Sequence, residues 1–256
     1  MSSIYQKYDD EIGKKNCDYN QLEKEMLNHH WQQDPELAWR LASIVYYKCL
    51  NLSNDEEIKL KTIESLRYAE KSIELFTKQQ NESVGGGDGN IFYAYKWSAM
   101  AHGRLALFEM ANVERKILYT ANFLQYLDKC LQQQEKQKES NQKITNDHLV
   151  LFMQGRFQLA LSMLSEDEQK IFQKRLGPNV VIPKLNLLDG ESKLRRSIEL
   201  QPDFIDNYIT LAYLLIKEHK ILDAKQIIEK GLQQQCCNKS DELIRQELLK
   251  IKETLG

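Results

Sequence analysis

Apolar residues recur every three or four positions along most of the chain, and polar breaks or Gly/Pro-containing breaks cut this pattern into segments of helical length. The pattern predicts helices at about 34–50, 56–78, 91–111, 113–133, 147–164, 166–176, 190–200 and 240–255, with two more between Asp206 and Leu232. No stretch shows the sustained alternation that is typical of strands. The fold is therefore expected to be all-α.

The C-terminal part of the chain is similar to itself at a shift of about 34 residues. Small residues then coincide with small ones and apolar residues with apolar ones, in the pairs Gly190 and Ala224, Leu194 and Ile228, Ser197 and Gly231, Ile198 and Leu232. A period of about 34 residues is that of the tetratricopeptide repeat (TPR), in which small side chains let two antiparallel helices approach closely. We predict a TPR-like right-handed superhelix of about four antiparallel helix pairs with a C-terminal capping helix.

The chain is expected to have two parts. Residues 1–33 are polar and predict an N-terminal arm or cap with one or two short helices, and residues 34–256 form the TPR-like helical domain. An insertion at about 165–187 interrupts the third pair; it opens with a capping-box pattern at Ser165. The glycine-rich stretch 85–89 lacks the Lys-Ser/Thr of a phosphate loop and predicts a flexible connection.

Composition and charge exclude several classes of protein. The net charge of −2 does not indicate a nucleic-acid partner. The five cysteines form no CxxC pair and, being odd in number, predict free thiols and not a disulfide framework. No apolar run reaches the roughly 18 residues of a membrane span, and the N-terminus has no signal-like apolar segment. We therefore expect a cytoplasmic protein with no integral membrane segment.

Motifs for catalysis or cofactor binding are missing. The chain contains no HExxH, GxSxG, Walker or Rossmann pattern, and His102 is expected to be a packing or surface residue. No metal and no cofactor are expected. A catalytic pair assembled only in three dimensions stays open, but a non-enzymatic binding protein is the favoured interpretation.

Stacked helix pairs form a concave surface, and side chains there are candidates for partner binding. We expect this role for Arg40, Lys96, Trp97, Arg104 and Arg156. The alternative is that Trp97 belongs to the core and that the arginines form surface ion pairs.

A second candidate surface is a local basic cluster of Lys193, Arg195 and Arg196, preceded by Lys184. Such a cluster can meet an acidic surface such as a tubulin tail. The alternative is a solvated helix face in which Glu191 and Glu199 balance the positive charge.

Several short motifs occur in a specific order. They are Asp-Pro-Glu-Leu-Ala-Trp-Arg-Leu-Ala at 34–42, Tyr-Lys-Trp-Ser-Ala-Met at 95–100, Leu-Asp-Lys-Cys-Leu at 127–131, Gly-Arg-Phe at 155–157 and Leu-Gly-Pro at 176–178. Together with the inserted helix, they resemble the regulator of microtubule dynamics family over about residues 34–254. The resemblance implies an all-α superhelical domain without enzymatic activity that associates with microtubules and the spindle.

One member of that family has a different role, because it tethers organelles through an N-terminal membrane segment and carries a lipid-binding domain. No such segment is present here. We therefore expect a non-enzymatic scaffold on a microtubule-based assembly, at the cytoskeleton, spindle or cilium, with tubulin or microtubule-bound proteins as partners. The alternative is a lipid-binding or lipid-transfer domain at organelle contacts, with phospholipid as its ligand.

Overall fold

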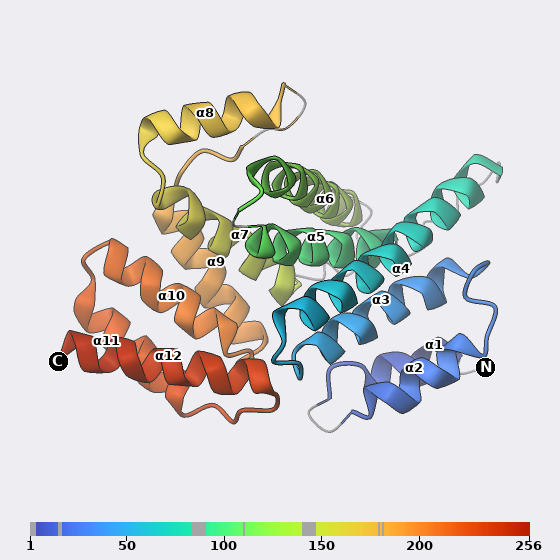
Figure 1. Ribbon diagram of the computed structural model, residues 1–256, viewed down its shortest axis with the longest axis horizontal. Coiled ribbons are helices and arrows are strands. Elements are labelled where there is room, and N and C mark those ends of the chain that lie inside the picture. The colour runs from blue at the N-terminus through green and yellow to red at the C-terminus, as the bar shows by residue number, and fades with distance from the viewer. Residues whose placement is uncertain are drawn as a thin grey trace. The chain divides into compact units, whose positions relative to one another are not determined.

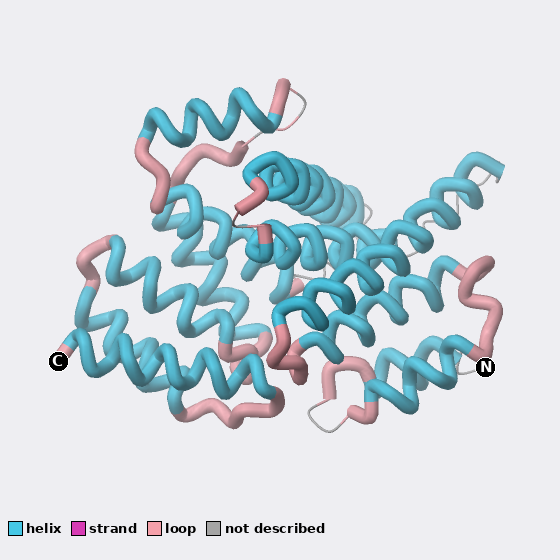
Figure 2. The backbone as a smooth tube through the Cα atoms, in the orientation of Figure 1, coloured by secondary structure: helices cyan, strands magenta, loops and turns pink. Residues whose placement is uncertain are grey.

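The computed structural model describes residues 4–14, 17–82, 91–109, 111–139, 147–178, 180 and 182–256 (Figure 1). Within these ranges the secondary structure consists of helices and connecting loops, and no strand is present (Figure 2). The prediction of an all-α, TPR-like architecture is confirmed. The glycine-rich stretch 85–89 lies outside the described residues.

The chain divides into two compact units, Met1–Gln142 and Lys143–Gly256. The described helices of unit one are α1 (Ile4–Glu11), α2 (Tyr19–Leu27), α3 (Pro35–Cys49), α4 (Asp55–Glu82), α5 (Ile91–Phe108) and α6 (Val113–Glu139). Helix α3 pairs with α4, α5 pairs with α6, and α4 also packs against α5. The two N-terminal helices cover α3, where Tyr8 and Met26 are buried against Leu37 and Leu41.

Unit two contains α7 (His148–Ser162), α8 (Glu166–Leu176), α9 (Leu187–Leu200), α10 (Asp206–Lys217), α11 (Ile221–Leu232) and α12 (Lys239–Leu255). Helix α7 pairs with α9, so that α8 is inserted in sequence between the two helices of one pair. Helix α10 pairs with α11, and α12 packs on both. Leu248 of α12 is fully buried in this core, as expected of a helix that closes the end of a repeat array.

Local sequence explains where many of these helices begin. The carboxylate of Asp34 accepts hydrogen bonds from the backbone N–H groups of Glu36 (2.9 Å) and Leu37 (3.2 Å), and Pro35 occupies the first turn. Asp147 caps α7 in the same way, and Ser165 forms a complete capping box with Glu168. These caps satisfy backbone donors that a helix leaves unpaired at its N-terminus.

Small polar side chains set the register of the helix pairs. The Ser72 hydroxyl of α4 donates to the carbonyl of Pro35 at the start of α3 (2.7 Å), and Ser197 of α9 donates to the carbonyl of His148 at the start of α7 (2.7 Å). The Cys130 thiol of α6 lies 3.9 Å from the carbonyl of Phe92 near the start of α5. In each pair, the second helix therefore approaches the first turn of the first helix closely enough for direct contact.

The last pair reaches the same close approach without a hydroxyl. Gly231 of α11 is buried, and a Cβ added there would lie 2.8 Å from the Cβ of Tyr208 in α10. Ala224, about two helical turns earlier on α11, has no solvent exposure. The expectation that both residues lie at this helix contact is confirmed.

Ala224→Leu should therefore overpack the α10–α11 contact. We expect the free energy of unfolding to fall by about 1–3 kcal/mol, because three extra carbon atoms must enter a filled core. Urea denaturation followed by circular dichroism measures the change. Leu222→Ala, at a leucine that is 77% exposed on the same helix, is the control and should change stability by less than about 0.5 kcal/mol. Equal midpoints for both variants would show that the helix register is wrong.

Candidate binding site on helices α3 and α5

Aromatic and cationic side chains alternate across the contact between α3 and α5. The Trp39 and Tyr93 rings are stacked with centroids 4.5 Å apart, and Trp97 lies 5.6 Å from Tyr46. We call these four rings the aromatic ladder. Three cations flank it: Arg40, Lys96 and Arg104. Four of the residues predicted for partner binding, Arg40, Lys96, Trp97 and Arg104, thus meet in one constellation.

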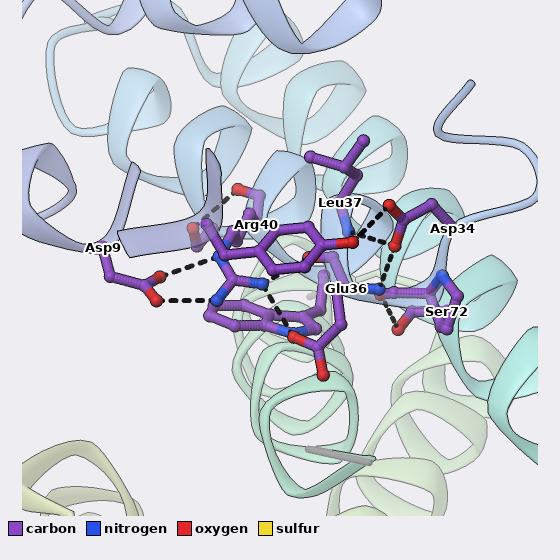
Figure 3. Close-up of polar contacts among 10 residues, drawn as sticks. Asp9, Asp34, Glu36, Leu37, Arg40 and Ser72 are labelled. Atoms are coloured by element: carbon purple, nitrogen blue, oxygen red, sulfur yellow. Dashed lines mark hydrogen bonds and ion pairs between the residues drawn. The ribbon is translucent and has the colours of Figure 1, made fainter. Parts of the chain in front are cut away.

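Arg40 anchors one end of the ladder (Figure 3). Its guanidinium lies 4.0 Å from the ring centroid of Trp39, and it forms ion pairs with Asp9 (2.6 Å) and Glu36 (2.7 Å). Asp9 accepts from both Nε and Nη2, which is the two-point geometry that suits a planar guanidinium. Arg40 is 3% exposed, so its guanidinium makes contacts within the protein and is not accessible to a partner.

The N-terminus of α3 holds this network in position (Figure 3). The Tyr5 hydroxyl donates to Asp34 (2.7 Å), the residue that caps α3. Burial, together with this hydrogen bond, raises the pKa of Tyr5 to about 12. Tyr5 therefore remains a protonated donor at neutral pH, and it ties α1 to the start of α3.

Lys96 and Trp97 occupy the middle of the ladder. The Lys96 ammonium lies 4.8 Å from the ring centroid of Tyr93 and 5.4 Å from that of Trp97. Lys96 and Trp97 are 6% and 3% exposed, so the expectation that a tryptophan here belongs to the core describes Trp97 well. Lys96 and Trp97 therefore form the buried base of the site and offer little surface for direct contact with a partner.

The accessible part of the site consists of two rings of the ladder, Tyr46 and Tyr93, and the flanking Arg104, and all three side chains are half-buried. The Arg104 guanidinium lies 5.2 Å from the Tyr46 ring centroid. Within the described part of the chain, no carboxylate lies within ion-pair distance of it. An arginine that is held by a ring but has no counter-ion can accept a carboxylate from a partner.

The other predicted residues lie in unit two and are placed differently. Three basic side chains of the cluster form ion pairs with carboxylates on their own helix, α9. The pairs are Lys193 with Asp189 (2.5 Å), Arg195 with Glu191 (2.7 Å) and Arg196 with Glu199 (2.7 Å). Arg195 and Arg196 line an open hollow of about 680 Å³ together with Lys220, which also pairs with Glu191 (2.7 Å). Local pairing therefore balances the cluster's charge, as the alternative interpretation expected.

Arg156 is exposed on α7, and its guanidinium lies 5.6 Å from the Phe152 ring centroid. It belongs to unit two and is not part of the ladder.

His102 is the most perturbed titratable group of α5. It is 3% exposed, it stacks on Tyr126 with centroids 5.6 Å apart, and neither ring nitrogen has a hydrogen-bond partner among the described residues. Burial lowers its pKa to about 4. The expectation that His102 is a packing residue agrees with this position.

This burial predicts acid sensitivity. An unfolded chain binds a proton at His102 below about pH 6.5, whereas the folded chain does so only near pH 4, so protonation favours unfolding in between. Stability should be complete above pH 6.5 and fall by up to about 1.4 kcal/mol per pH unit between 6.5 and 4. Urea denaturation at a series of pH values measures this slope. His102→Gln should flatten the curve in this window, and an unchanged slope would assign the acid sensitivity to other groups.

Among the described residues, no group of three or more His, Cys, Asp or Glu side chains is placed to hold a metal ion. None of the described helices is long and apolar enough to span a membrane.

Sequence reasoning missed two features of the site. Asp9 was not expected to pair with Arg40, because the two residues are 31 positions apart and no local pattern links them. Tyr93 was not singled out, although its spacing to Trp97 and Arg104 places all three along one side of a helix. The helical periodicity of α5 therefore contained a usable signal.

The fold and the site together define a helical repeat protein built from TPR-like helix pairs, with an aromatic and cationic face in unit one. The model of one protein family, described as Regulator of microtubule dynamics protein 1-3, matches residues 4–256. The chain belongs to this family, as the order of its motifs predicted. The family name links the chain to the regulation of microtubule dynamics. A search of curated proteins finds no match to the chain.

Proposed function

We propose that this protein is a non-enzymatic scaffold of a microtubule-based assembly, such as a spindle or an axoneme, and that the aromatic ladder of unit one binds its partner there. Membership of the family supports the link to microtubules. The observation that carries the choice of site is Arg104, a guanidinium held on Tyr46 without a counter-ion among the described residues. The missing catalytic motifs favour binding over catalysis.

The chemistry of the ladder suits an acidic segment of tubulin or of a protein bound to it. A carboxylate can pair with Arg104, and the half-buried rings of Tyr46 and Tyr93 offer apolar contact beside it. Aromatic and arginine side chains in a partly desolvated position are the usual energetic centres of an interface. The buried network around Arg40 keeps the rings in place before the partner arrives, which lowers the entropy cost of binding.

The basic cluster of α9 is a weaker candidate for the main contact. To bind an acidic partner, each basic side chain must exchange a carboxylate on its own helix for a carboxylate of the partner. This applies to Lys193, Arg195 and Arg196. Such helix pairs are worth only about 0.3–0.5 kcal/mol, so the exchange is inexpensive but also yields little net energy. We assign the cluster a supporting role.

Co-sedimentation with polymerised tubulin tests the proposal. Arg104→Glu should weaken binding about tenfold or more, because a partner carboxylate would then face a like charge. Arg67→Glu, at an exposed arginine of α4, makes the same charge change elsewhere in unit one and should have a smaller effect. Binding by the wild type should also weaken as the salt concentration rises.

Two results would contradict the proposal. Equal weakening by Arg104→Glu and Arg67→Glu would show that the ladder is not the contact. Absence of wild-type pelleting, together with phospholipid bound to the purified protein in native mass spectrometry, would favour a lipid-binding role.

A further inference from the structure

Helix α8 is attached to adjacent segments of unit two by side-chain hydrogen bonds and packs little against the other helices of that unit. It is not among the closely packed helix pairs of the described residues, and Figure 1 shows it standing apart from α10, α11 and α12. The Gln169 amide donates to the carbonyls of Leu161 (3.2 Å) and Leu164 (3.1 Å). The Gln173 amide donates to the carbonyl of Val180 (2.8 Å) and accepts from the N–H of Ile182 (3.3 Å). The helix is thus fixed in orientation while one face remains uncovered.

The uncovered face carries opposite charges at equal distances on the two sides of a central isoleucine. Ile171 lies at the midpoint of α8, which spans Glu166–Leu176, and it is 54% exposed. Acidic residues fill the first turn of the helix and basic residues fill its last turn. Helical geometry places Asp167, Glu168, Lys174 and Arg175 around Ile171 on this face, and all four are exposed. Within the chain, Asp167 also pairs with Lys170 (3.0 Å) and the Glu168 carboxylate accepts from the Ser165 N–H (2.7 Å), so both acidic residues must share or exchange a local contact on pairing.

We propose that α8 pairs antiparallel with α8 of a second copy of the chain, about a two-fold axis at Ile171. In this arrangement Asp167 lies opposite Arg175 of the second molecule, because both are four positions from Ile171. Glu168 lies opposite Lys174 of the second molecule, because both are three positions away. The two-fold axis repeats both contacts, so four charge pairs surround two isoleucine side chains. A parallel arrangement would instead place like charges side by side.

The pairing is self-complementary but small. An 11-residue helix buries less surface than a standard interface of roughly 1,600 Å², and surface charge pairs contribute about 0–1 kcal/mol each. We therefore expect a reversible dimer with a dissociation constant on the order of 10–100 µM. This surface is independent of the aromatic ladder, so the dimer does not rest on the proposed function.

Sedimentation equilibrium of the full chain tests the proposal by charge reversal. D167K alone places a positive charge opposite Arg175 of the second copy, and R175E alone places a negative charge opposite Asp167. Each variant should associate about tenfold more weakly than the wild type or remain monomeric. An equal mixture of the two should regain dimers, because both contacts across the axis again join opposite charges.

A second pair of variants tests the apolar centre. Ile171→Ser should abolish the dimer, and Leu222→Ser, at a more exposed leucine of α11, should leave it unchanged. Circular dichroism of each variant establishes that it is folded. A wild type that stays monomeric to about 500 µM, well above the expected dissociation constant, would overturn the proposal. A mixture of D167K and R175E that fails to associate, or a dimer that survives Ile171→Ser, would overturn it as well.

Discussion

Gly155→Val should lower the free energy of unfolding by about 3 kcal/mol or more. Gly155 lies where α7 crosses α9, and a Cβ added there would lie 2.4 Å from the Leu194 Cγ and 3.0 Å from the Gly190 carbonyl oxygen. Leu194 has no solvent exposure and cannot move aside, and the Gly190 carbonyl belongs to the backbone of α9. Valine adds two further methyl groups, so the two helices must separate. Thermal unfolding followed by circular dichroism measures the loss.

Alanine substitutions at two helical glycines form the matched comparison. Glycine to alanine inside a helix is worth up to about 1 kcal/mol of stabilisation from backbone entropy alone. At Gly103 the new Cβ meets only the edge of the Phe123 ring at 3.1 Å, which a small rotation relieves, so Gly103→Ala should be nearly neutral. Gly155→Ala should be destabilising in spite of the same entropy gain. Equal effects at both positions would show that α7 and α9 are not in such close contact.

Arg40→Ala should destabilise unit one by about 3–5 kcal/mol. The substitution removes a guanidinium that is 3% exposed, together with its ion pairs to Asp9 and Glu36 and its contact with the Trp39 ring. It also takes the Arg40 ion pair away from the Glu36 carboxylate, whose side chain is 21% exposed. Removal of one partner from a buried pair costs more than the pair contributes, because the other charge stays desolvated.

Tryptophan fluorescence during urea denaturation is a suitable measurement for this variant, because Trp31, Trp39 and Trp97 all lie in unit one. Arg67→Ala removes an equal charge from an exposed position on α4 and should change stability by less than about 0.5 kcal/mol. If Arg40→Ala unfolded at the same urea concentration as the wild type but bound tubulin poorly, Arg40 would be a partner contact and not a structural anchor.

Most helices of this protein were predictable because their signals are local. Asp34-Pro35 and the Ser165 capping box mark helix starts through contacts that span two or three residues. The prediction of helix ends was less accurate, since α6 was expected to stop near Gln133 but continues to Glu139. Residues 134–139 are Gln, Glu and Lys, which favour helix without favouring burial, so an apolar pattern does not show where such a helix ends.

The close contacts between paired helices were predictable in part. Small residues at Gly190, Ser197, Ala224 and Gly231 followed from the 34-residue register, and all four are buried. The hydroxyl bonds of Ser72 and Ser197 to first-turn carbonyls did not follow from it, because their partners lie 37 and 49 residues away. A repeat period thus indicates which positions face a neighbouring helix, but not which atoms they meet.

The basic side chains show most clearly what tertiary structure adds. On α9, carboxylates three or four residues away balance Lys193, Arg195 and Arg196, and the sequence alone already indicated this alternative. On α3, Arg40 resembles a surface arginine in sequence, yet α1 buries it and supplies Asp9. The amino-acid sequence by itself determined the helices and the local charge balance, because these depend on neighbours within about two turns. It also showed the pairing period, because small and apolar positions recur after about 34 residues. Only the tertiary structure decided that Arg40 is an anchor and that Arg104 is accessible, because burial and long-range pairing depend on which helices pack together.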